Sequence, residues 1–216
     1  MTAELTFEVV GARAEPHAAA PAIALRLCIT AADDEPVHAI ALNCQLRIEP
    51  QRRSYSPAEE AGLYDLFGET SQWGRSLRPF LWTNVAAMVT GFTGHTETDL
   101  LVMCSYDMEV AGARYLHGLH GGDVPLLLLF SGTAFGTGAA PGGGGFAAQP
   151  LSWSSEASFR LPQRVWREAM DLHFPNSGWL RLSHESLDGL ARFKATKGLA
   201  TWDQTVEQLL KEVDEP

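Results

Sequence analysis

Residues 151–173 read LSWSSEASFRLP and then QRVWREAMDLH, and the spacing of their apolar residues changes at Pro162. Before the proline, apolar and polar side chains alternate, which is the two-residue period of a strand with one buried face. After it, apolar residues recur at helical spacing, at Val165, Trp166, Ala169 and Met170. The stretch therefore predicts a strand that runs directly into an amphipathic helix.

Upstream of Pro162, about eight stretches show the alternation of strands. In the clearest of them, residues 40–48, every second side chain is apolar and most of the others are polar. Residues 124–130 read VPLLLLF and do not alternate, which predicts a strand buried on both faces. We therefore expect residues 1–161 to form an antiparallel β-sandwich.

One helix is expected as an insertion in the sandwich, at about residues 57–67. Ser56 and Glu59 have the spacing of a capping box, and Pro57 occupies the first helical position. Gly68 follows the last expected helical residue, where a glycine commonly ends a helix.

Residues 162–216 are expected to form a C-terminal extension of about three helices. The first follows Pro162, the second follows Ser183 and ends at Gly198, and the third begins after Thr201. We expect this extension to pack on the sandwich as a helical cap. The predicted fold class is therefore mainly β, of the α+β type.

Length and charge argue against several classes of partner. The chain has 216 residues and a formal net charge of −10. Nucleic acids and anionic membranes are bound by clustered Lys and Arg, so an acidic chain argues against both. The longest apolar run, residues 124–130, is too short to span a bilayer, and the first residues lack the pattern of a signal peptide. A cytoplasmic location is expected.

The sequence carries no motif of a known catalytic or cofactor site. It has no GxSxG nucleophile elbow, no SxxK pair and no GxGxxG after a strand. The glycine run at residues 142–145 has no lysine that would make it a phosphate-binding loop, and it is interpreted as a hairpin loop. Three widely spaced cysteines form neither a CxxC pair nor a disulfide framework. We therefore expect no enzymatic activity and no cofactor.

His117 and His120 support an alternative function. Together with Asp123 or His95 they would offer imidazole and carboxylate ligands to a transition metal. A surface turn is the commoner explanation for two histidines flanked by glycines, so no metal is expected. The alternative is a small-molecule or metal-binding protein that uses the mouth of the sandwich, and a hydrolase ranks third.

Four residues are the candidates for a partner-binding surface: Arg52, Arg53, Trp73 and Trp179. Arginine and tryptophan dominate the binding energy of protein interfaces, and these four lie in segments with a loop-like pattern. The two arginines could instead pair with acidic groups of the chain itself, and each tryptophan could fix a loop to the core. Both alternatives remain open at the level of sequence.

Four segments resemble an uncharacterised actinobacterial family of the domain-of-unknown-function type, and the likeness extends over nearly the whole chain. They are residues 38–53, 91–94, 124–132 and 172–180. Members of that family are typically encoded beside nickel-iron hydrogenase genes, which implies an accessory role. The family has no assigned catalytic residues, so the resemblance implies none here.

The expected function is that of a non-enzymatic accessory, assembly or scaffolding protein. The resemblance implies that its partner is a hydrogenase subunit or maturation factor, or a component of a similar redox complex. Self-association of the chain stays open.

Overall fold

The computed structural model describes residues 4–32, 36–105, 107, 110–138, 145–178 and 180–214. The chain divides into two compact units, Met1–Gly178 and Trp179–Pro216. About 42% of it is strand and 33% is helix, with two antiparallel sheets, and this confirms the predicted mainly-β α+β class. The division lies after the first of the three C-terminal helices, 17 residues beyond the predicted boundary at residue 161.

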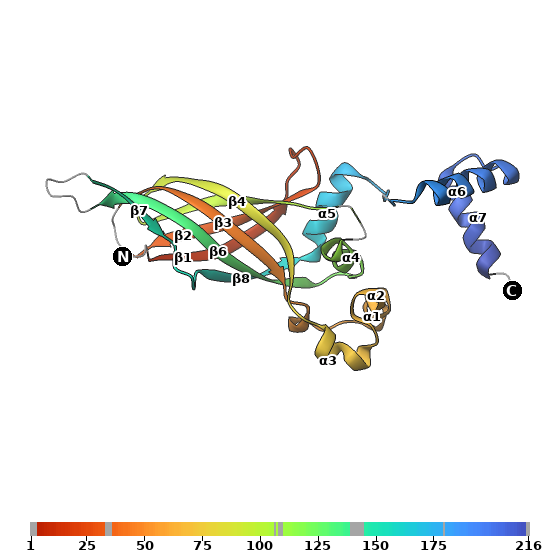
Figure 1. The fold of residues 1–216 in the computed structure, drawn as a ribbon, viewed down its shortest axis with the longest axis horizontal. Helices are drawn as coiled ribbons and strands as arrows, with labels where there is room; N and C mark the ends of the chain where they lie inside the picture. Colours follow the sequence, from red (N-terminus) through yellow and green to blue (C-terminus); the bar gives the residue numbers. More distant parts are fainter. Residues whose placement is uncertain are drawn as a thin grey trace. The chain divides into compact units, whose positions relative to one another are not determined.

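The first unit contains two antiparallel sheets (Figure 1). The first sheet has the order β1-β2-β5 and consists of β1 (Leu5–Ala14), β2 (Ala22–Ala31) and β5 (His95–Met103). The second has the order β4-β3-β6-β7, and β8 also pairs with β6. Its strands are β3 (Val37–Ile48), β4 (Phe80–Phe92), β6 (Asp123–Gly138), β7 (Gly145–Pro150) and β8 (Glu156–Pro162). The pairing of β6 with β7 confirms the predicted hairpin, although residues 139–144 lie outside the described part.

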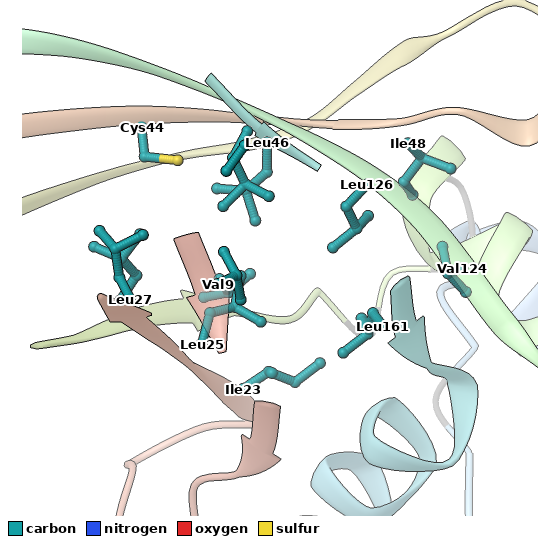
Figure 2. Close-up of a cluster of buried hydrophobic side chains, with 14 of the residues drawn as sticks. Val9, Ile23, Leu25, Leu27, Cys44, Leu46, Ile48, Val124, Leu126 and Leu161 are labelled. Atoms are coloured by element: carbon teal, nitrogen blue, oxygen red, sulfur yellow. The ribbon is translucent and has the colours of Figure 1, made fainter. Parts of the chain in front are cut away.

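Side chains from both sheets form one hydrophobic core (Figure 2). Alternate residues of β1 and β3 point inward, as the two-residue period predicts, whereas Ala22–Leu25 of β2 are all buried. The rings of Phe7 and Phe130 stack across the sheets at 4.4 Å. The prediction that residues 124–130 of β6 are buried on both faces is wrong. Only the inner face has a continuous buried row, formed by Val124, Leu126, Leu128 and Phe130. Leu127 and Leu129 on the outer face are half-buried. In register, Leu127 lies between Arg47 and Ser158, so polar neighbours rather than a second core border it.

The inserted helical segment begins with η1 (Pro50–Arg52) and continues through four further short elements. They are α1 (Pro57–Gly62), α2 (Tyr64–Phe67), η2 (Thr70–Gln72) and α3 (Trp73–Ser76). The predicted capping box of Ser56 and Glu59 is present, and Gly68 ends α2 with a φ of 72°. The expected helix at 57–67 is interrupted at the fully buried Leu63, so it forms two short helices rather than one.

Two helices of the first unit lie at one end of the sandwich (Figure 1). They are α4 (Ala111–His117), which the sequence pattern did not predict, and α5 (Gln163–His173). Helix α5 directly continues β8 and buries the predicted stripe of Val165, Trp166, Ala169 and Met170. It ends before a turn in which Asn176 has a φ of 51°.

The second unit consists of α6 (His184–Lys197) and α7 (Trp202–Asp214). The residues predicted to begin and end these helices do so in the structure. Ser183 caps α6, Gly198 ends it in the left-handed conformation with a φ of 67°, and the Thr201 hydroxyl accepts from the N–H of Gln204 at 3.2 Å. Packing of these helices on the sandwich stays a prediction.

Candidate functional site

Arg53 is buried inside the first unit, and its binding partners belong to the chain itself. Its side chain is 9% exposed, and its Nη2 lies 2.7 Å from Oε1 of Glu59, which is also buried. The guanidinium further donates to the carbonyl oxygens of Ser54, Gly121 and Asp123. It thereby joins the segment after β3 to the turn before β6, which favours the internal-pairing alternative for this residue.

Glu59 is the acidic half of this buried pair and connects it to two backbone segments. Its carboxylate accepts from the backbone N–H of Ser56 at 2.9 Å and of His120 at 3.0 Å. Burial alone raises the pKa of Glu59 and is the largest single influence on it. The two N–H groups and Arg53 together outweigh burial, so the pKa of Glu59 lies below its ordinary value. The carboxylate is therefore ionised and is a structural anchor.

Trp73 is also a core residue, which favours the alternative that it fixes a loop to the core. It is 8% exposed, and its indole N–H donates to the carbonyl oxygen of Gly68 at 2.9 Å. Its ring makes edge contacts with Tyr55 and Phe67. The hydroxyls of Tyr55 and the fully buried Tyr115 lie 2.8 Å apart, and burial raises the pKa of Tyr55 to about 12. The tryptophan therefore fixes the inserted segment to the core.

Arg52, in contrast, has a side chain that is 56% exposed. It borders a depression of about 540 Å³ that is lined by Gln51, Arg52, Arg53, Ser54, Gly122, Asp123 and Arg160. An adjoining depression of about 120 Å³ is also lined by Arg52 and Arg160, together with Glu49, Pro125, Leu126, Ser158 and Phe159. We refer to the two depressions together as the arginine pocket. Guanidinium groups in such a position can bind an oxyanion.

The other predicted site residues do not join this pocket. Trp179 lies outside the described residues. His117 and His120 are both exposed, at the end of α4 and in the turn that follows it. Among the described residues, no group of three or more His, Cys, Asp or Glu side chains is close enough to hold a metal ion. Cys44 and Cys104 are buried, and burial raises the pKa of each thiol to about 12, which leaves them protonated and unreactive.

The second unit presents apolar side chains that its own helices cover only in part, since Nζ of Lys194 in α6 lies 5.8 Å from the centre of the Trp202 ring. Trp202 and Val206 are each 48% exposed, Leu210 is 60% exposed and Val213 is 80% exposed. No residue of α6 is buried, and in the described part of α7 only Thr205 is. We refer to the exposed residues Trp202, Val206, Leu210 and Val213 as the α7 stripe. Throughout the described residues, no helix is both long and apolar enough to cross a membrane.

The model of the family of unknown function DUF6084 matches residues 2–216. The chain belongs to this family. No curated protein matches the chain at a significant level. The actinobacterial origin and the hydrogenase gene neighbourhood implied by the sequence resemblance stay predictions.

Two solved structures of a β-glucosidase from Kluyveromyces marxianus, one selenomethionine-labelled and one in complex with glucose, have a weak similarity to this member of DUF6084. Their identities to the chain are 7% and 8%, and the TM-scores are 0.26 and 0.25. The alignments cover 73% and 74% of this chain but only 15% of each β-glucosidase chain. At these TM-scores the similarity carries no argument about fold or function.

Proposed function

We propose that the protein is a non-enzymatic accessory or assembly protein that binds a partner protein through the α7 stripe. The observation that carries the proposal is the exposure of this stripe in a unit of two short helices. Such a unit is too small to bury a stabilising core, and isolated helices of this length are marginal in water. In this proposal a partner protein, rather than the sandwich of the same chain, supplies the missing burial.

The spacing within α7 specifies what kind of surface this is. Trp202, Val206, Leu210 and Val213 are separated by four, four and three residues, which places them along one face of the helix, as in a helix that packs against another helix or in a groove. Trp202 supplies the large aromatic anchor typical of such contacts. The partner therefore presents a complementary apolar groove or helix face.

The class of partner is proposed from the family resemblance. It implies a nickel-iron hydrogenase subunit or maturation factor, or a component of a similar redox complex. The sequence supports a non-enzymatic role, because it carries no nucleophile, metal or dinucleotide motif.

A pair of double variants tests this proposal. Val206→Gln with Leu210→Gln removes two apolar contacts, while Glu207→Gln with Lys211→Gln changes two exposed polar residues of the same helix. Both pairs leave the net charge unchanged. The tagged full-length protein is used to capture partners from native lysate, and the captured chains are identified by mass spectrometry.

We expect a hydrogenase subunit or maturation factor with the unchanged chain and with Glu207→Gln/Lys211→Gln, and its loss with Val206→Gln/Leu210→Gln. Circular dichroism of the sandwich should be the same in all three proteins. Retention of the partner by Val206→Gln/Leu210→Gln would contradict the proposal. A homo-oligomer that this variant dissociates would also contradict it, because a second copy would then cover the stripe.

A further inference from the structure

Two of the three arginines that line the arginine pocket, Arg52 and Arg160, come from segments more than a hundred residues apart in sequence. The backbone N–H of Glu49 donates to the carbonyl oxygen of Pro125 at 2.9 Å, and Pro125 is the register partner of Arg160. Arg52 is the last residue of η1, three positions after Glu49. The pairing of β6 and β8 therefore places Arg160 across Pro125 from the segment that carries Arg52.

The guanidinium groups of Arg52 and Arg160 have N–H donors that bond to none of the described residues. Within the described residues, neither Arg52 nor Arg160 makes a side-chain hydrogen bond, whereas Arg53 makes several. Nη1 of Arg52 lies 3.1 Å from Oε2 of Glu49 as an ion pair, but this buried oxygen accepts no hydrogen bond in the described part of the chain. Glu49 therefore positions Arg52 by charge and leaves its N–H groups available.

The charges around the pocket favour a ligand with a single negative charge. Arg53 is neutralised by Glu59, and Arg52 faces Glu49. Asp123 and Arg160 both line the larger depression, and among the described residues Arg160 has no ion pair. A phosphate, which carries about −1.5 to −2 on one group at neutral pH, would experience more repulsion from these acids than one carboxylate of a protein segment whose other carboxylates lie outside the pocket.

We propose that the arginine pocket binds a carboxylate group presented by an acidic protein segment, with Arg160 and Arg52 as the donors. The carboxylate follows from the guanidinium of Arg160, which has no ion pair among the described residues, from the remaining N–H groups of Arg52 and from the acidic lining. That it belongs to a segment of a protein partner rests on the proposed function. The pocket is then a second contact surface, built on the sandwich rather than on α7.

The test measures binding of a capped triglutamate peptide to the purified full-length protein at low ionic strength, by NMR of the arginine Nε–Hε groups. A capped triglutamine peptide, inorganic phosphate and acetate are the comparison probes. The variants are Arg160→Gln, Arg52→Gln and Asp123→Asn. Arg164→Gln is the matched control, because Arg164 is an exposed arginine four residues from Arg160 that pairs with Glu168 outside the pocket.

We expect the triglutamate peptide to shift the signals of Arg52 and Arg160 and to bind at least about tenfold more tightly than triglutamine. Arg160→Gln and Arg52→Gln should each weaken binding about fivefold or more, Arg164→Gln less than about twofold, and Asp123→Asn should strengthen it.

Three results would overturn the proposal. An equal loss with Arg164→Gln would mean that overall charge alone attracts the peptide. Tighter binding of phosphate than of triglutamate would exclude the carboxylate preference. Binding of acetate as tight as that of triglutamate would identify a free small carboxylate rather than a protein segment. None of these variants changes α7. A negative result for the arginine pocket can therefore be distinguished from a negative result in the partner-capture test of the α7 stripe.

Discussion

Helices α5 and α7 have the same kind of amphipathic pattern but opposite surroundings. In α5 the apolar stripe is buried, with Trp166 only 7% exposed, because the helix continues β8 and lies at one end of the sandwich. In α7 the corresponding aromatic residue, Trp202, is 48% exposed. An apolar stripe therefore identifies the face of a helix that needs cover, but the position of the helix in the fold decides what provides it.

Replacing each of the two tryptophans tests this comparison, and it gives the largest expected difference in the free energy of unfolding. Trp166→Ala should lower the free energy of unfolding by about 3–5 kcal/mol, because it removes a large buried side chain and leaves a cavity. Trp202→Ala should change it by less than about 1 kcal/mol, since much of that ring is already in water. Urea unfolding followed by circular dichroism measures both. Equal losses would mean that α7 is covered within the purified protein.

Arg53 and Arg52 repeat the comparison at neighbouring positions. Arg53 is enclosed by its pairing with Glu59, and Arg52 extends into the arginine pocket. Glu59→Ala should therefore destabilise the protein by about 3 kcal/mol, because it leaves the Arg53 guanidinium buried without its counter-charge and removes the capping box.

The matched control for this change is Glu60→Ala, at the next position of the same helix. Glu60 has no part in the capping box or in the Arg53 pair. Its substitution should change the urea midpoint only slightly, so a comparable loss in both variants would refute the role given to the buried pair.

The local structure was largely predictable from sequence, because it depends on neighbouring residues. The two-residue period predicted the inward-pointing residues of β1, β3 and the inner face of β6, but it failed before β8, where Trp153 is 96% exposed in a turn although it alternates in phase with Ala157 and Leu161. The capping residues Ser56, Ser183 and Thr201 marked the starts of helices, and Gly68 and Gly198 marked their ends. Each of these signals acts within four residues along the chain.

The candidate site was predictable only in part, because it depends on contacts between distant segments. Arg52 was identified by its residue type and its loop-like segment, but nothing in the sequence indicates that Pro125 brings Arg160 to it. The same limitation explains Arg53 and Trp73. Their residue types suggested a binding surface, whereas their long-range and local hydrogen bonds place them inside.

The smallest expected effect concerns the ion pairs on the outer face of the β1-β2-β5 sheet. Arg26 donates to Asp99 from Nε at 2.6 Å, and Arg13 also pairs with Asp99. These hydrogen bonds, with that of Arg26 the strongest influence, hold the pKa of Asp99 below its ordinary value. A carboxylate with a lowered pKa in the folded state contributes stability that is complete above its unfolded pKa of about 4. The contribution is lost as the pH falls through the folded value.

Asp99→Asn should therefore be less stable than the unchanged protein at pH 7, by no more than about 1 kcal/mol for a pair this exposed. The difference should shrink as the pH falls below about 4, because the unchanged protein loses its contribution there and the amide has none to lose. Urea midpoints measured at pH 7 and at successively lower pH values follow this convergence. Glu8→Gln, on the same face of the sheet, provides the control, because Glu8 has no ion pair within the described residues. A difference for Asp99→Asn that stays constant with pH would show that the side chain acts through packing rather than through its charge.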